Sequence, residues 1–269
     1  MRPVVDLWRQ HGRWFVLTGA GVSTSSGIPD YRDESGAWKR PQPVRYAEFM
    51  GQSEVRRRYW SRSLVGWPMF RAAKPGPAHH ALAELERRGG IGMLVTQNVD
   101  RLHQQAGGEQ VVDLHGRLDE VVCQGCDFRF RRDEMQVELE RANPSFAKLH
   151  ATRAPDGDAD LAGLDLTHFR VPDCPQCSGI LKPDVVFFGE RVPPERVDIA
   201  FGQLERADAV LVVGSSLMVW SGFRFAREAA RQGKPLVIIN RGRTRADELV
   251  THKLDEDCGV ALNELLRQL

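Results

Sequence analysis

The sequence predicts an α/β protein in which a parallel sheet carries a smaller inserted domain. Short apolar runs end in glycine or small polar residues, as buried parallel strands do, and they lie at Trp14–Thr18, Gly92–Thr96, Val111–Leu114, Val185–Phe188, Ala209–Val213 and Leu236–Asn240. Helix-like stretches follow several of them, at His79–Arg88, Pro194–Arg206 and Phe223–Gln232. Strand–helix alternation with short connections predicts a parallel sheet covered on both faces, a Rossmann-like arrangement.

This alternation breaks down in two places, which predict the inserted domain. Residues from about 31 to 88 are rich in Arg, Trp and Pro and read as a loop followed by helices. Residues from about 119 to 182 hold two cysteine pairs and a polar stretch, Ala154–Asp160. We therefore expect one domain over residues 1–269, with a Rossmann-like part at about 1–30, 89–118 and 183–269 and a small helical and zinc-binding part built from the two insertions.

Composition excludes several classes of protein. The hydrophobic share of 42% and the charged share of 27% are those of a soluble globular protein. A net charge of +1 provides no global field toward nucleic acid or membrane. No run approaches the roughly 20 apolar residues that span a bilayer, and the N-terminus lacks a signal-peptide core. Free thiols fit a reducing compartment. We expect a cytoplasmic monomer that binds neither nucleic acid nor membrane.

The cysteine pairs predict one structural metal ion. Cys123 and Cys126, and Cys174 and Cys177, each have the two-residue gap that lets a turn present two thiolates to one ion, and together they form a closed tetrahedral zinc set. A closed set has no position for water or substrate, so the chemistry lies elsewhere. Two disulfides or four unrelated thiols are the alternatives. The fifth cysteine, Cys258, has no partner in the sequence and suits a small buried apolar role.

A glycine-rich loop follows the first predicted strand. Gly19 and Gly21 let the backbone turn sharply and approach a diphosphate, although a plain turn would explain them as well. Gly27 falls six residues after Gly21, where the dehydrogenase fingerprint needs three, so hydride transfer is excluded. The following Pro29–Arg32 has no apolar periodicity, and ordering such a loop is costly unless a ligand uses it.

Polar residues also follow the other predicted strands. Asn98 and Asp100 alternate with an apolar residue and can face one pocket, although either could instead cap a helix. His115 ends the next strand beside a glycine, whereas His79, His80 and His103 lie in helix-like sequence and are weaker candidates. The segments Val213–Leu217 and Ile239–Gly242 place small hydroxyls, an amide and glycines at strand ends. Ligands bind at the carboxyl ends of parallel strands, so five such endings predict a nucleotide site.

These motifs together resemble the sirtuins, a family of NAD-dependent protein-lysine deacylases. The matching segments occur in family order over about residues 14–266, and they are Gly19–Ser23, Gly27–Arg32, Thr96–His103, Leu114–Gly116, the cysteine pairs, Lys182–Glu190, Val213–Leu217 and Asn240. Tyr31, Ser216–Phe225 and Ala154–Asp158 look most like the class II branch, which includes a mitochondrial member associated with ADP-ribosyl transfer and with removal of larger acyl groups.

The resemblance implies a set of residue roles. NAD is consumed as a co-substrate, and the acyl group passes from lysine to ADP-ribose as nicotinamide leaves. Asn98 and Asp100 would line the nicotinamide pocket, and His115 would act as general base on a ribose hydroxyl, for which an ordinary His pKa near 6.5 is suited. The implied NAD contacts are Gly19, Ala20, Gly21, Ser23, Asp30, Tyr31, Arg32, Gln97, Asn98, Asp100, Gly214, Ser215, Ser216, Asn240, Arg241, Gly242 and Cys258.

The resemblance also implies how a substrate peptide binds. The peptide would add as a strand between Val186–Glu190 and Ser216–Val219, which brings Val186, Phe187, Phe188, Gly189 and Val219 into contact with it. Tyr59 and Arg62 share the Tyr-x-x-Arg spacing with which class III sirtuins bind a dicarboxylic acyl group, but Ile28–Asp30 is not the class III version of its loop. A mono-ADP-ribosyltransferase, a deacylase of long or dicarboxylic chains, and a zinc-ribbon module that binds DNA or protein are the competing interpretations.

Overall fold

The computed structural model describes residues 1–39, 43–148 and 165–269, so the polar stretch Ala154–Asp160 lies outside the described residues. The chain divides into two compact units. Unit 1 comprises Met1–Pro41, Lys74–Leu114 and Val192–Leu269, and unit 2 comprises Gln42–Ala73 and His115–Arg191. Among the described residues, no helix is both long enough and apolar enough to cross a bilayer.

Unit 1 contains a six-stranded sheet in the order β3-β2-β1-β7-β8-β9. All neighbours pair in parallel, and their bounds are β1 Trp14–Thr18, β2 Ile91–Thr96, β3 Val111–Asp113, β7 Ala209–Val213, β8 Leu236–Ile239 and β9 His252–Leu254. Counted along the chain within this sheet, the order is third, second, first, fourth, fifth, sixth. This is the doubly wound arrangement, in which the strand order reverses between β1 and β7. The predicted α/β class is confirmed.

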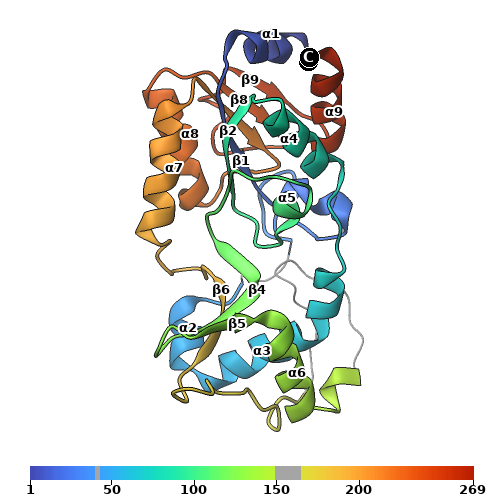
Figure 1. Cartoon of the computed structure of the whole chain (residues 1–269), viewed down its shortest axis with the longest axis vertical. Helices are drawn as coiled ribbons and strands as arrows, with labels where there is room; N and C mark the ends of the chain where they lie inside the picture. The colour runs from blue at the N-terminus through green and yellow to red at the C-terminus, as the bar shows by residue number, and fades with distance from the viewer. Residues whose placement is uncertain (40–42, 149–164) are drawn as a thin grey trace. The chain divides into compact units, whose positions relative to one another are not determined.

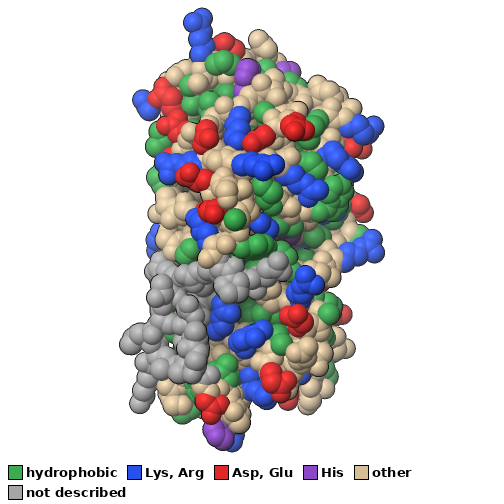
Figure 2. Space-filling model, turned by 180° about the vertical axis from the view of Figure 1, so that it is seen from behind, with side chains coloured by type: hydrophobic (Ala, Val, Ile, Leu, Met, Phe, Trp, Pro, Cys, Tyr) green, Lys and Arg blue, Asp and Glu red, His purple; other side chains and the backbone are tan. Residues whose placement is uncertain are grey.

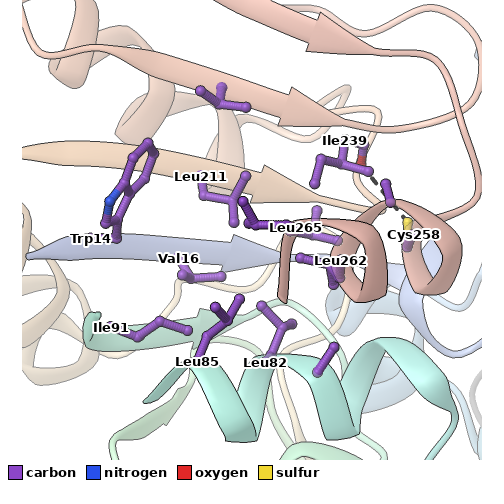
Figure 3. Close-up of a cluster of buried hydrophobic side chains, with 14 of the residues drawn as sticks. Trp14, Val16, Leu82, Leu85, Ile91, Leu211, Ile239, Cys258, Leu262 and Leu265 are labelled. Atoms are coloured by element: carbon purple, nitrogen blue, oxygen red, sulfur yellow. Dashed lines mark hydrogen bonds between the residues drawn. The ribbon is translucent and has the colours of Figure 1, made fainter. Parts of the chain in front are cut away.

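Alternate residues of the central strands point to opposite faces, and helices cover both faces (Figure 1). On one face, Val16, Leu211 and Ile239 pack with Leu82 and Leu262, which come from α4 and α9 (Figure 3). On the other face, the intervening strand residues pack against α7 and α8. The helices of this unit are α1 Arg2–Gln10, α4 Pro77–Arg87, α5 Leu102–Gln105, α7 Pro194–Arg206, α8 Trp220–Arg231 and α9 Cys258–Gln268, with 3-10 turns η1 Ala20–Val22 and η2 Thr24–Ser26.

Unit 2 is built on an antiparallel three-stranded sheet in the order β5-β4-β6. Its elements are α2 Tyr46–Gly51, α3 Ser53–Arg71, β4 Gly116–Cys123, β5 Arg129–Arg131, α6 Arg132–Ala142, η3 Phe146–Lys148 and β6 Leu181–Val185. Its core is rich in aromatic residues, and Trp60, at 0% exposure, lies at its centre with Phe49 and Leu139. The side chains of α3 and α6 therefore close one face of the small sheet.

The structure corrects two strand predictions. Val185–Phe188 is not a strand of the parallel sheet, because the strand lies earlier, at Leu181–Val185, and pairs antiparallel with β4. The sixth parallel strand is instead β9, which the sequence analysis did not predict. In addition, α4 belongs to unit 1, since Leu82 and Leu85 pack against the large sheet, so unit 2 takes less of residues 31–88 than expected. On the face drawn in Figure 2, cationic and anionic side chains are interspersed, in keeping with the net charge of +1.

Candidate functional site

The sheet edge between β1 and β7 is formed by two loops in close contact. Gly21 N donates to Gly214 O at 2.8 Å, and a Cβ on Gly21 would lie 2.8 Å from Gly214 Cα. Gly214 adopts φ +61, and a Cβ on it would lie 2.5 Å from Val22 N. Backbone atoms cannot give way as a flexible side chain can, so both positions require glycine.

Three backbone donors at this edge have no acceptor in the described part of the protein: the N–H groups of Ala20, Ser215 and Ser216. They follow β1 and β7 directly, where the strand order reverses. Unpaired N–H groups at such a point are suited to phosphate oxygens. The donors come from the two loops that the glycine contact holds together, and these loops lie in one unit.

Ser23 is the centre of a buried hydrogen-bond network beside this edge. Gly76 N donates to His79 Nδ1 at 3.1 Å, so the hydrogen bonds assign the ring proton to Nε2, which donates to Ser23 Oγ at 3.3 Å. Ser23 Oγ in turn donates to Asp100 Oδ2 at 2.7 Å and accepts from Asn98 Nδ2 at 3.1 Å. The single hydroxyl thus uses one donor and two acceptor positions, its full capacity.

Asp100 has two functions in this network. Its Oδ1 accepts from Leu102 N at 2.9 Å, a local bond from the residue before Arg101, and Arg101 is the N-cap of α5. Its Oδ2 accepts from Ser23, and burial raises the pKa of this carboxyl above its ordinary value. Asn98 donates through Nδ2 to Gly19 O at 3.0 Å and to Ser23. The structure therefore brings the side chains of Asn98 and Asp100 to one hydroxyl, that of Ser23.

A second histidine extends the network toward the sheet. His103, 2% exposed, contacts Thr18 Oγ1 at 2.9 Å through Nε2, and Thr18 donates its only proton to Thr96 Oγ1. His103 Nε2 is therefore the donor, and the ring is neutral. The His79 and His103 rings lie 4.8 Å apart between centroids. Burial lowers the pKa of His79 to about 4 and the pKa of His103 well below its ordinary value.

The remaining predicted NAD contacts of unit 1 lie around the same strand ends. Gln97 Nε2 donates to Ser215 Oγ at 2.8 Å and bridges β2 and β7. Asn240, 8% exposed, donates to Arg241 O at 2.6 Å. Gly242 adopts φ +75 and donates its N–H to Asp255 Oδ1.

Cys258 is buried, and burial raises the pKa of its thiol to about 12, so it is inert and packs as an apolar residue.

The loop after η2 is held by its own contacts. The Arg32 guanidinium lies 3.9 Å from the ring centroid of Trp38 and donates to Gly36 O at 2.7 Å. Tyr31 meets the edge of the same tryptophan at 6.2 Å, and Asp30 pairs with Lys39 at 2.5 Å. Trp38 thus organises the predicted Asp30–Arg32 segment.

Unit 2 contains His115 and the predicted substrate residues other than Val219, which lies in unit 1. His115 follows Leu114, the last residue of unit 1 before the chain enters unit 2, and its carbonyl accepts from Val186 N at 2.8 Å. The Val186–Glu190 segment ends in a turn in which Glu190 N donates to Phe187 O, while Phe188 forms a bridge with Arg45. Glu190 Oε2 accepts from Phe187 N at 2.8 Å and pairs with Lys182 Nζ at 3.1 Å. The Lys182 side chain is only 4% exposed. This buried ion pair fixes the turn that follows β6.

Tyr59 and Arg62 lie on α3, three residues apart. Tyr59 is 4% exposed and packs its ring 5.5 Å from Phe49 and 5.3 Å from Phe187. Arg62 is half-buried. Tyr59 is therefore part of an aromatic cluster that reaches the Val186–Glu190 turn, whatever further role it has.

The four paired cysteines converge as the sequence predicted. All four Sγ atoms lie within 4.8 Å of one another, with 3.4 Å between Cys123 and Cys177 and 3.8 Å between Cys126 and Cys174. Tetrahedral zinc with Zn–S bonds of about 2.3 Å places its sulfurs about 3.8 Å apart. A Cβ on Gly179 would lie 2.9 Å from Cys123 Sγ, so this glycine leaves the thiolates room. The set fits one structural zinc ion, and the disulfide alternative does not describe four converging thiols.

Comparison with known proteins identifies the family. The Sir2 family model matches residues 19–221 of this chain. The chain belongs to the Sir2 family. A protein of Xanthomonas axonopodis pv. citri (strain 306) named "NAD-dependent protein deacetylase" is 62% identical over 257 residues, which cover 96% of this chain and 88% of that protein. "NAD-dependent protein deacetylase 1" of Streptomyces coelicolor (strain ATCC BAA-471 / A3(2) / M145) is 48% identical over 269 residues, 100% of this chain and 90% of its own length.

Solved Sir2 structures share the fold over the whole chain. One described as "Sir2-p53 peptide-NAD+" has a TM-score of 0.82 and 31% identity and covers 100% of this chain and 98% of its own. Another, "Sir2 bound to acetylated peptide", has a TM-score of 0.79 and 30% identity with the same coverage. The predicted resemblance to this family is confirmed.

Three members of the buried network in this Sir2 chain were missed or ranked low from sequence: His79, His103 and Thr18. Their partners are far away in the chain, 56 residues for His79 with Ser23 and 85 residues for His103 with Thr18. A histidine in a helical sequence carries no local sign of such a partner. The one available signal was the polar residue at the end of an otherwise apolar strand, Thr18 in β1 and Thr96 in β2.

Proposed function

We propose that this protein is an NAD-dependent protein-lysine deacetylase that moves the acyl group from lysine to ADP-ribose and releases nicotinamide. The observation that carries this proposal is the set of unpaired N–H groups of Ala20, Ser215 and Ser216 beside the Gly21–Gly214 contact, a cradle for a dinucleotide diphosphate. The relatives named as NAD-dependent protein deacetylases support it, at 62% and 48% identity.

NAD supplies the ribose carbon to which the acyl oxygen is transferred, and the residues of unit 1 would hold it. The loops after β1 and β7 would bind the diphosphate. The ribose and phosphate groups would be contacted by Gln97, Ser215 and Asn240. The Asn98–Ser23–Asp100 cluster would line the nicotinamide pocket. It is already ordered by hydrogen bonds, so ligand binding costs little rearrangement of these side chains. The other proposed NAD contacts are Gly19, Asp30, Tyr31, Arg32, Arg241, Gly242 and Cys258.

His115 would be the general base that takes a proton from a ribose hydroxyl. Its backbone is fixed by the Val186 N–H, which donates to its carbonyl, and its side chain is half-buried. Positioned general bases typically contribute about 10²–10⁴-fold to rate. A His115→Tyr variant should therefore lose deacetylation while still binding NAD, and full activity in that variant would remove this assignment.

The substrate peptide would pair in an extended form with Val186–Glu190 and with Ser216–Val219. Among the described residues, Leu217 O, Met218 N and Val219 N have no partner in the protein, so the second segment offers free backbone groups. Backbone pairing provides affinity with little selectivity for side chains. Phe187, Phe188 and Gly189 would contact the peptide, and acetyl is the proposed acyl group because the relatives are named protein deacetylases.

The test is to incubate the zinc-loaded protein with NAD and an acetyl-lysine peptide and to follow three products by mass spectrometry: deacetylated peptide, nicotinamide and O-acetyl-ADP-ribose. All three should form in equal amounts. Nicotinamide release with ADP-ribose on protein and no deacetylated peptide would favour the mono-ADP-ribosyltransferase. Longer and dicarboxylic acyl chains in the same assay, with Arg62→Gln as a variant, test the acyl preference. We further propose that the enzyme is a cytoplasmic monomer.

A further inference from the structure

An aromatic and cationic patch lies on α8 of unit 1, directly after the Ser216–Val219 segment. Trp220 is the first residue of the helix and is 46% exposed, which is unusual for so large an apolar side chain. Phe223 lies one turn further, with 5.9 Å between the two ring centroids. Arg227 is seven residues after Trp220 and therefore lies on the same side of the helix.

Two arginines are stacked on these rings. The Arg227 guanidinium lies 4.5 Å from the Trp220 centroid. Arg245 comes from the loop between β8 and β9, and its guanidinium lies 5.6 Å from Trp220 and 4.3 Å from Phe223. Stacking occupies the face of a guanidinium and leaves its N–H edge available for hydrogen bonds. The two cations are thus held in place with donors still exposed.

Neither guanidinium has an anionic partner within ion-pair distance among the residues that the structure describes. The nearby carboxylates form ion pairs with other residues: Glu228 pairs with Arg231 at 2.6 Å, although its charge also acts on Arg227 at longer range, and Asp247 pairs with Lys253 at 2.9 Å. Two ordered but unpaired cations beside an exposed indole provide charge complementarity for carboxylates.

Arg245 also connects this patch to the segment proposed to pair with the peptide. Its backbone N–H donates to Ser216 O at 2.9 Å, and its Nη1 donates to Met218 O at 3.3 Å. These bonds occupy the carbonyls of Ser216 and Met218 and leave Leu217 O, Met218 N and Val219 N for another strand. A chain that pairs with those groups would continue toward the first turn of α8.

We propose that Trp220, Arg227 and Arg245 form a subsite for aspartate or glutamate residues that flank the acylated lysine, so that the enzyme selects lysines in acidic sequence. This inference rests on the proposed function, because it places the acidic residues on the same bound peptide. Arg227 and Arg245 would be specificity-determining residues that contact the substrate without taking part in the chemistry.

The experiment compares acetyl-lysine peptides of equal length whose flanks carry two Glu, two Gln or two Lys. Solvent-exposed ion pairs are each worth about 1.5- to 5-fold, so two should give the Glu peptide about a 2- to 25-fold advantage over the Gln peptide in kcat/KM. The advantage should appear in KM rather than kcat. It should also shrink as salt rises from 0.1 to 1 M, since the Debye length falls from about 10 to about 3 Å.

The variant Arg227→Gln/Arg245→Gln should abolish the preference for Glu over Gln, both in kcat/KM and in peptide binding. The matched control is Arg2→Gln/Arg206→Gln, which removes the same charge from exposed positions on α1 and α7 and should keep the preference. Trp220→Ala should weaken the preference without changing net charge.

Binding of fluorescently labelled Glu and Gln peptides, measured by polarisation, gives a readout that does not depend on turnover. Equal kcat/KM and equal binding of the two peptides would overturn the proposal, as would the same loss of preference in both double variants. A different result would assign the patch to nucleic acid. In that case the wild type would bind an oligonucleotide in a salt-sensitive way, only Arg227→Gln/Arg245→Gln would lose this binding, and the Glu and Gln peptides would not differ. Failure to deacetylate even the Gln peptide would count against the proposed function, whereas the subsite would still be judged by peptide binding.

Discussion

Removing one hydroxyl, in Ser23→Ala, should destabilise the protein far more than its size suggests. Ser23 is 1% exposed and serves three partners, at 3.3 Å for His79, 2.7 Å for Asp100 and 3.1 Å for Asn98. Asn98 keeps its bond to Gly19 O, but His79 loses its acceptor and the Asp100 Oδ2 atom loses its donor. The space left by one oxygen atom is smaller than a water molecule needs.

The expected magnitude follows from those two orphaned groups. Leaving a buried polar group without a partner costs about 1–3 kcal/mol, so Ser23→Ala should lower the free energy of unfolding by about 2–6 kcal/mol. Urea unfolding at pH 7.5 measures this change as a lower midpoint at constant slope. The Ser23 hydrogen bond also lowers the pKa of Asp100 against the effect of burial, so that pKa should rise further in the variant. If the rate falls at low pH because Asp100 becomes protonated, that fall should occur at a higher pH in the variant.

The matched control is Ser25→Ala, two residues along the same loop, where the serine is exposed. An exposed substitution away from any network should stay within about 0.5 kcal/mol of the wild type. If Ser23→Ala were as stable as Ser25→Ala, the Ser23 hydroxyl would not stabilise the network, and the reasoning would be refuted.

Four further predictions follow from the same contacts. Chelation of zinc should unfold unit 2 and abolish activity, with recovery on adding Zn²⁺, because closed thiolate sites couple metal binding to folding; a metal-free protein that stayed folded and active would contradict this. The lowered pKa of His79 alone should cost the wild type about 2 kcal/mol of stability between pH 7 and 5, because the unfolded chain protonates His79 below pH 6.5 while the folded chain resists until about pH 4. The buried His103 adds a loss of the same sign, and urea titrations should show a flatter profile in His79→Gln. Gly214→Ala should cost about 1–2 kcal/mol for its left-handed backbone and about 1–3 kcal/mol more for the clash with Val22 N, whereas Gly233→Ala, with φ +67 and open space, should show only the first cost. Glu190→Gln should cost about 1–3 kcal/mol by removing the negative charge beside buried Lys182, whose Nζ still donates to Val185 O, and should raise the KM for peptide more than the KM for NAD; equal kinetics would remove the role of this ion pair in shaping the turn.

The parallel strands were predictable where their sequence is apolar throughout. β1, β7 and β8 lie in the centre of the sheet and are buried on both faces, so continuous apolar runs mark them. β9 has only three half-buried residues, His252–Leu254, and lies at the edge of the sheet, so its sequence resembles a loop. The Val185–Phe188 assignment was wrong because a short apolar run does not indicate which of its residues pair with a neighbouring strand. The strand is β6, which pairs with β4 and contains the buried Lys182.

The sequence by itself determined the features that depend on neighbours in the chain. Two cysteine pairs predict a metal site, because a two-residue gap fixes the geometry of two thiolates locally. Apolar runs predict buried strands, because a strand buried on both faces has few polar side chains. The tertiary structure alone decided the features that depend on distant partners: the neutral state of His79 and His103, the Gly21–Gly214 contact, and the stacking of Arg245 on α8. Their energies come from desolvation and close approach across the sheet, which no local pattern encodes.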